Sequence, residues 1–175
     1  MSNIDHLSDR IAGLLIAEFR RRVFEENIPR LKKCLGLLTE EEVWWRPNEH
    51  SNSVGNLVLH LCGNAQQYVV SGIGGVPDTR KRQAEFDERG PIPIAELLQR
   101  LDALQVDLEK VLDQLKPAHL AEERRVQGFS ENVTSILVHV VEHFSYHTGQ
   151  VTYYVKYRKD LDTGYYAGLD LDVTN

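Results

Sequence analysis

The chain has 175 residues, of which 42% are hydrophobic and 26% charged, and its net charge is −6. This size and balance are typical of one globular domain, so we expect residues 1–175 to form a single domain, with the acidic tail 160–175 docked on its surface or flexible. The acidic charge argues against nucleic acid or an anionic membrane as a partner, because both require a basic surface. We expect the short basic runs at residues 20–22 and 80–82 to be solvated surface.

Several observations favour a cytoplasmic protein. No apolar run approaches the roughly 18 residues that a membrane span requires. The first residues show no basic region followed by an apolar stretch, so no signal peptide is expected. Cys34 and Cys62 make neither a disulfide framework nor a CxxC pair. We interpret them as small buried thiols in a reducing compartment.

The periodicity of apolar residues predicts four long helices and no convincing strand. The first spans about residues 8–38, where Pro29 is expected to kink or divide it. Thr39 then opens a capping-box pattern for a short helical turn. Residues 77–93 are charged, lack a periodic pattern and are long enough for a crossover connection. The other long helices are expected at about residues 53–71, 94–115 and 132–156. The sequence therefore predicts an all-α fold, a four-helix bundle with one or two long connections.

The second predicted helix lies in a segment without charge, since residues 51–77 contain no Asp, Glu, Lys or Arg. A surface helix normally carries charges on its wet face, so this helix is expected to be buried within the bundle or against a second subunit. Its polar residues lie within about 40° of His60 around the helix. They are Ser53, Asn56, Asn64, Gln67 and Ser71. We interpret this polar stripe as the wall of a cleft, the alternative being an exposed strip that lacks charge.

The fourth predicted helix carries histidines at positions 139, 143 and 147, four residues apart. Residues four apart stack on one helix face, and two histidines in this register are the helical way to build half a metal site. The face of His143 and His147 also carries Ile136, Gln150 and Tyr154. Because that face includes apolar positions, we expect the imidazoles to point into the bundle.

A third histidine, His60, lies on the polar stripe of the second helix. Three neutral nitrogen ligands and one water make the open arrangement of catalytic zinc, whose bound water loses its proton near pH 7. Nickel, manganese and iron(II) also accept imidazole. The pattern therefore predicts a divalent metal site without choosing the metal.

Two other metal motifs fit less well. Residues 139–143 match the HxxEH pattern of inverted zinc proteases, but those enzymes need a carboxylate ligand well downstream, and 175 minus 143 leaves only 32 residues. A di-iron bundle needs paired Glu-x-x-His motifs, which the sequence lacks. Glu142 lies about 100° from His143 around the helix, so we do not assign it as a general base.

Residues 52–64, NSVGNLVLHLCGN, and residues 139–150, HVVEHFSYHTGQ, resemble the DinB superfamily, in the branch with HLxGN and HxxxHTGQ motifs. The WWRP stretch at residues 44–47 fits that branch as well. The resemblance implies a four-helix bundle of up-down-down-up topology with a long crossover connection, commonly dimeric. It implies His60, His143 and His147 as metal ligands and His139 as a neighbour that orients a ligand or a bound water. The usual family ending is HRGQ, and Thr148 replaces its arginine here, so an anionic substrate is not carried over.

Characterised members of this family include transferases that use a metal to activate the thiol of bacillithiol or mycothiol, and others look like metal-dependent hydrolases. The resemblance therefore implies a mononuclear tri-histidine protein that binds zinc or nickel, with manganese or iron as further options. It implies a small-molecule substrate, a low-molecular-weight thiol in the transferase case, and a homodimer. No catalytic residue is assigned. The expected pocket residues are Asn56, Asn64, Gln67, Gln150 and Tyr154.

A second hypothesis is a non-enzymatic, dimeric, stress-associated binding protein in which the metal is structural or absent. The charge-free helix would then be mainly an interface and the histidines a packed core. Under this hypothesis, changing Val58 or Val69 to Asp should disrupt the dimer.

Overall fold

The computed structural model describes residues 3–174, and residues 1, 2 and 175 lie outside it. The first long helical segment consists of α1 (Asn3–Arg20), a π-helical stretch η1 (Arg21–Asn27) and α2 (Ile28–Leu37). The predicted break near Pro29 takes the form of this wider π-helical stretch. Proline lacks an N–H and clashes with the carbonyl of the preceding turn, and wider turns relieve that clash. The side chain of Asn27 also donates to the Arg22 carbonyl at 2.7 Å, which satisfies an acceptor there.

The remaining long helices begin within one residue of the predicted positions. Ser53 and Asn56 form a capping box at the start of α4 (Val54–Ala65), which continues as the π-helical η2 (Gln66–Ser71). Asn132 caps α7 (Val133–Lys159) by accepting from the Ser135 N–H. The predicted third helix is α6 (Ile94–Leu112), and Thr39 caps the short α3 (Glu40–Trp44).

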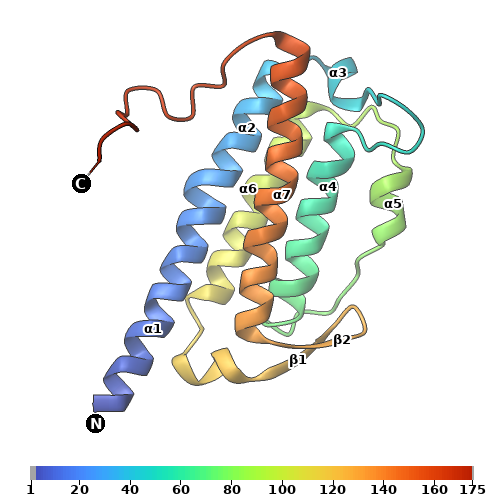
Figure 1. The fold of residues 1–175 in the computed structure, drawn as a ribbon. Coiled ribbons are helices and arrows are strands. Elements are labelled where there is room, and N and C mark those ends of the chain that lie inside the picture. The colour runs from blue at the N-terminus through green and yellow to red at the C-terminus, as the bar shows by residue number, and fades with distance from the viewer. Residues whose placement is uncertain (1–2, 175) are drawn as a thin grey trace.

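The four long helical segments pack together around one apolar core. In Figure 1, α4 and α6 run in the direction opposite to α1, α2 and α7. α7 contacts α2 and α4, and α6 contacts the same two helices from the other side. Each segment contributes fully buried side chains. Examples are Leu31, Leu61, Leu101 and Phe144.

The charge-free helix is buried within this chain. Val58 and Val69 are both 0% exposed, because α4 and η2 are covered by α5, α6 and α7. These two valines therefore cannot be interface residues, and the proposed test of a dimer by Val58→Asp or Val69→Asp would report core disruption instead. None of the helices within residues 3–174 combines the length and apolar character that a membrane span requires.

A small sheet corrects the prediction of a purely helical chain. After a 3-10 turn, η3 (Pro117–Ala121), β1 (Glu123–Val126) pairs antiparallel with β2 (Phe129–Asn132). Gln127 and Gly128 join the strands with φ of 53° and 86°, which is the backbone of a two-residue hairpin turn. The strands were not predicted because each has only four residues, and their charged side chains leave no clear alternation of apolar and polar positions.

The charged connection at residues 77–93 also contains structure that the sequence pattern did not predict. It forms the short helix α5 (Arg82–Asp87), which packs on α4 beside the bundle (Figure 1). Two turns are too short for apolar periodicity to be visible. Its position is fixed instead by polar contacts with α4.

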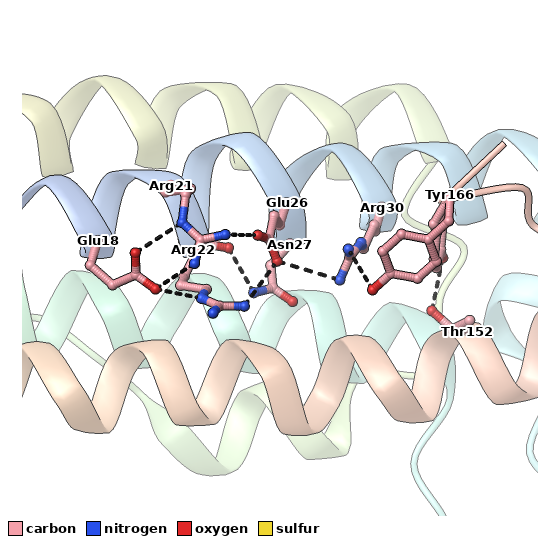
Figure 2. A network of polar contacts seen from close by, with 9 residues as sticks. Glu18, Arg21, Arg22, Glu26, Asn27, Arg30, Thr152 and Tyr166 are labelled. Carbon is pink, nitrogen blue, oxygen red and sulfur yellow. Dashed lines mark hydrogen bonds and ion pairs between the residues drawn. The ribbon is translucent and has the colours of Figure 1, made fainter. Parts of the chain in front are cut away.

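A polar network runs along the surface of the first helical segment (Figure 2). The arginine run at residues 20–22 is partly solvated, as predicted, and its side chains pair with nearby carboxylates, among them Arg21 with Glu18 at 2.6 Å. The network continues through Arg30 to the hydroxyl of Tyr166 at 3.3 Å. It therefore connects the first segment to the C-terminal tail.

The tail from Asp160 to residue 174 forms neither helix nor strand, and its first part docks on the helices. Thr163 is buried, and the Tyr165 hydroxyl lies 2.8 Å from Thr152 Oγ1 and 3.1 Å from Cys34 Sγ. Beyond this point Leu169, Leu171 and Val173 are exposed, and the chain leaves the bundle (Figure 1).

Candidate metal centre

Three histidines converge between α4 and α7. His60 extends from α4, and His143 and His147 extend from neighbouring turns of α7. His143 Nε2 lies 3.1 Å from His60 Nε2 and 3.1 Å from His147 Nε2, and one nitrogen from each ring falls within 4.8 Å of the other two. The structure thus brings together the three side chains that the sequence predicts to be ligands.

Hydrogen bonds on the far side of two of these rings determine which nitrogen faces the centre. His60 Nδ1 is 2.9 Å from Glu85 Oε2, and His147 Nδ1 is 2.7 Å from Gln150 Oε1. Carboxylate and amide oxygens accept, so each Nδ1 carries the hydrogen and donates it. The Nε2 lone pairs of both rings are therefore left pointing at the centre, which is the arrangement of metal-ligating histidines in proteins.

The middle ring, His143, is suited to bind a cation rather than a proton. Burial, followed by the neighbouring imidazoles, lowers the pKa of His143 to about 3, so its ring is neutral at pH 7. Its Nδ1 is buried and has no hydrogen-bond partner among residues 3–174. Burial also lowers the pKa values of His139 and His147. The neutral imidazoles of His139, His143 and His147 thus lie together at this point of the bundle.

Two of the three nitrogen–nitrogen separations fit a divalent ion, and the third, between His60 and His147, lies within 4.8 Å. Zinc binds imidazole nitrogen at about 2.0–2.1 Å, so two nitrogens on a tetrahedral ion lie about 3.3 Å apart. The observed separations of 3.1 Å from His143 to the other two rings are close to that value. Lone pairs held this close repel one another unless a cation or a shared proton lies between them.

An ion pair from the charged connection covers His60. Arg80 donates from Nε to Glu85 Oε1 at 2.7 Å and from Nη2 to Oε2 at 2.9 Å, so Arg80 and His60 share the same carboxylate. Burial alone would raise the pKa of Glu85, but hydrogen bonds from Arg80 and His60 outweigh it and leave that pKa below its ordinary value. The prediction that the basic run at residues 80–82 is solvated is wrong for Arg80, whose side chain is 4% exposed.

Gly63 allows this ion pair to approach the helix. A Cβ at Gly63 would lie 2.0 Å from Glu85 Oε1, far inside van der Waals contact. The glycine three residues after His60 therefore leaves the space that the carboxylate occupies. This gives a physical reason for the glycine in the HLxGN motif of this chain.

The polar residues of the α4 stripe mainly form hydrogen bonds with α5 and the residues beside it, rather than lining open space. Asn56 is fully buried and donates to the carbonyls of Glu85 at 2.8 Å and Glu88 at 2.9 Å. Gln67 accepts from Arg80 Nη1 at 2.8 Å and lines a separate groove between α4 and α6. Of the polar residues predicted to line a pocket, these two are used mainly to fix the Arg80–Glu85 segment. The only signal for this segment in the sequence is the density of charge that follows a charge-free helix.

His139 and Asn64 lie at the edge of the histidine cluster. His139 Nε2 is 3.3 Å from the Asn64 side-chain amide, and its ring stacks on Tyr68 with 4.4 Å between centroids. The His139 ring also lies nearly parallel to that of His143, at 5.5 Å and 15°. His139 therefore contacts a predicted ligand by stacking.

A cleft of about 820 Å³ opens one turn farther along α4 and α7, and we call it the aromatic cleft. It contains Gln150 and Tyr154, which the sequence predicts as pocket residues, together with rings that it did not predict. The cleft adjoins the histidine cluster, because Gln150 bonds His147 and the Tyr146 ring lies 4.9 Å from the His147 ring. The aromatic residues of the cleft are Trp45, Tyr146, Tyr153, Tyr154 and Tyr157.

Comparison with known proteins identifies the family. Among solved structures, the chain is similar to a DinB-like protein, YjoA, from Bacillus subtilis, with a TM-score of 0.62 and 16% identity over 85% of this chain and 94% of that one. No curated protein sequence matches at a significant level. The family model of the DinB superfamily matches residues 23–151, a range that includes all three converging histidines. The chain therefore belongs to the DinB superfamily.

Proposed function

We propose that this chain is a divalent-metal-binding protein whose mononuclear site is made by His60, His143 and His147, and that it acts as a metal-dependent thiol transferase or hydrolase. The observation that carries the proposal is the convergence of three Nε2 atoms, two of them on rings whose Nδ1–H is already donated. Zinc and nickel suit three imidazoles, and manganese and iron accept them too.

When bound, the ion supplies positive charge that stabilises a deprotonated thiol or water at neutral pH. The chain's own residues prepare the site for it. Glu85 and Gln150 hold the rings of His60 and His147 in one tautomer, and burial keeps His143 neutral and available. The aromatic cleft beside His147 is where we place a small-molecule substrate.

The architecture proposed with this function is a single domain, a four-helix bundle of up-down-down-up topology. The directions of the long helices in Figure 1 support it. We also propose a homodimer, formed through an apolar face that α1 and α7 present to solvent. The residues that support this face are Leu7, Ile11, Leu14 and Val138, each more than half exposed.

The second candidate, a non-enzymatic binding protein with a structural metal, is favoured by one observation. α5 covers the site, and its Phe86 ring lies 4.7 Å from the His60 ring. A cobalt-substituted sample separates the two candidates. A change of the visible spectrum on adding azide would show an open coordination position, and an unchanged spectrum would favour the structural metal.

Metal analysis tests the main proposal. After metal-free dialysis and reloading with zinc or nickel, the wild type should retain about one ion per chain, as a mononuclear site requires. The His60→Ala, His147→Ala variant should retain none while keeping its helical circular dichroism. His6→Ala, at an exposed histidine on α1 away from the cluster and the cleft, is the control and should bind like the wild type. A wild type that binds no ion under any loading condition would refute the proposal.

A further inference from the structure

The aromatic cleft has a form that suits a flat ligand. Tyr146, Tyr153 and Tyr157 follow one face of α7 at intervals of seven and four residues, which stacks their rings along the helix. Their side chains are 63%, 75% and 71% exposed, so large ring surfaces face solvent. In the same lining, Trp45 and Tyr154 stack with 5.8 Å between centroids and 21° between planes. Part of the lining is therefore a preformed aromatic stack, and the rest consists of exposed rings.

The cleft differs from the other two large grooves of the molecule in charge. The groove between α4 and α6 is lined by seven charged residues, among them Asp78, Lys81 and Arg100. The groove between α1 and α7 is also lined by charged residues, among them Glu18 and Arg22. Among residues 3–174, no Asp, Glu, Lys or Arg lines the aromatic cleft.

Among the described residues, the lining of the cleft therefore offers a charged occupant no carboxylate, ammonium or guanidinium partner. Aromatic rings also attract cations, but cation-binding cages gain from a nearby carboxylate, which the described lining lacks. A cation is already present, because the Arg158 guanidinium lies 5.4 Å from the Trp45 ring. A second cation would meet repulsion there. A neutral ring meets none, and stacked aromatic pairs are favourable beyond the area they bury.

The size and position of the cleft connect it to the candidate metal centre. Its volume of about 820 Å³ falls within the range of small-molecule sites, about 300–1,000 Å³. Two of its residues, Tyr146 and Gln150, contact the His147 ring directly. A molecule stacked in the cleft would thus have one end beside His147.

We propose that the aromatic cleft binds a neutral molecule with a planar aromatic ring and that this molecule is the substrate whose reacting end lies next to His147. The substrate role rests on the proposed function, whereas binding of the ring in the cleft does not require a metal. Tyr153 and Tyr157 stack on the ring, and Trp45 and Tyr154 form the wall behind it.

A matched pair of probes tests the claim. 4-Nitrobenzyl alcohol is neutral and planar, and its nitroaromatic ring quenches tryptophan fluorescence. Cyclohexylmethanol has a similar size and the same hydroxyl but a saturated ring. Titration calorimetry should show tighter binding of the aromatic probe, and its binding should quench Trp45. The quenching should decrease strongly in Trp45→Phe, which leaves Trp44 as the remaining tryptophan.

Substitutions of the exposed tyrosines test whether the aromatic probe binds in the cleft. Tyr153→Ala and Tyr157→Ala should each weaken the aromatic probe about threefold, and the double variant about tenfold, because each removes one stacking partner. Both side chains are exposed, so folding should be unaffected. Tyr166→Ala, at an exposed tyrosine outside the cleft, is the control and should bind the probe like the wild type.

Three results would overturn the proposal. The first is equal affinity for the two probes, and the second is unchanged binding of the aromatic probe in the double variant. The third is sedimentation showing a dimer that the double variant dissociates, which would make this surface an interface between two copies. Metal content, measured on the same samples, separates this proposal from the first. Metal retained without probe binding refutes the cleft alone, and probe binding without any metal uptake refutes the metal site and with it the substrate role.

Discussion

Two arginine–carboxylate clusters in this chain use the same chemistry in different surroundings. On the first helical segment, Arg21 and Arg22 pair with Glu18, and these side chains are 44–48% exposed (Figure 2). Beside His60, Arg80 pairs with Glu85, and these side chains are 4% and 11% exposed. Exposed ion pairs contribute little to stability because water and salt screen them. Loss of one partner of the buried pair would leave the other charge buried and unpaired. The pair therefore stays together and holds the His60 ring, which bonds to the same Glu85 carboxylate.

The largest expected effect comes from breaking the buried pair. Glu85→Ala leaves Arg80 buried and unpaired, and we expect the free energy of unfolding to fall by about 3–5 kcal/mol. The joint change of Arg80→Met and Glu85→Leu should recover much of this loss, because it removes both charges. Urea unfolding of the metal-free proteins measures both effects. Glu18→Ala is the matched control in the exposed cluster and should leave the unfolding midpoint unchanged. Equal destabilisation by the two substitutions would contradict the comparison.

A smaller effect on stability, with a clear effect on metal binding, is expected from Gly63→Ala. The new methyl group would displace the Glu85 carboxylate from His60. We expect zinc affinity to fall about 10- to 100-fold, as for other losses of a carboxylate behind a ligating histidine. The accompanying loss of stability should be about 1–3 kcal/mol.

Competition with a chromophoric chelator measures the zinc affinity of this variant. Gly36→Ala is the control, because a Cβ there meets no atom within 4 Å. It should bind zinc normally and be as stable as the wild type or slightly more so. Normal zinc affinity in Gly63→Ala would show that Glu85 does not hold His60 for the metal.

Acid should affect the buried histidines and the exposed arginine–carboxylate cluster at different pH. The pKa of His143 is about 3 in the folded chain and near 6.5 when unfolded, so the unfolded state binds more protons between these values. The contribution of His143 to the stability of the metal-free protein should therefore fall as pH decreases from about 6.5 towards 3, by less than the ~1.4 kcal/mol per pH unit that one proton can give. Hydrogen bonds from Arg21 and Arg22 lower the pKa of Glu18 to about 2, so the exposed cluster stays ionised over this window. His143→Gln should reduce the slope, and an unchanged slope would assign the acid sensitivity elsewhere.

The features that could be predicted from the sequence depend on residues that lie close together along the chain. The histidine register on α7, the helix starts near Ser53 and Asn132 and the burial of α4 all follow from spacing or composition within one helix. Arg80 and Glu85 contact His60 from 20 and 25 residues away in sequence, through a segment with no periodicity. Their position depends on Gly63 and Asn56, whose roles become visible only when α5 lies against α4. The aromatic cleft was missed for a related reason, since Trp45 and the tyrosines of α7 meet only after folding.

Because the tail covers Cys34, the reactivity of this thiol reports detachment of the tail from the helices. The Cys34 thiol is fully buried behind Tyr165, so a thiol reagent reaches it only after the tail detaches. The other thiol, Cys62, is only partly buried, contrary to the prediction, and lines the groove between α4 and α6. It gives little background because desolvation raises its pKa to about 12 and keeps it protonated. The labelling rate of the native protein therefore measures how often residues 160–166 leave the helices, without any added probe.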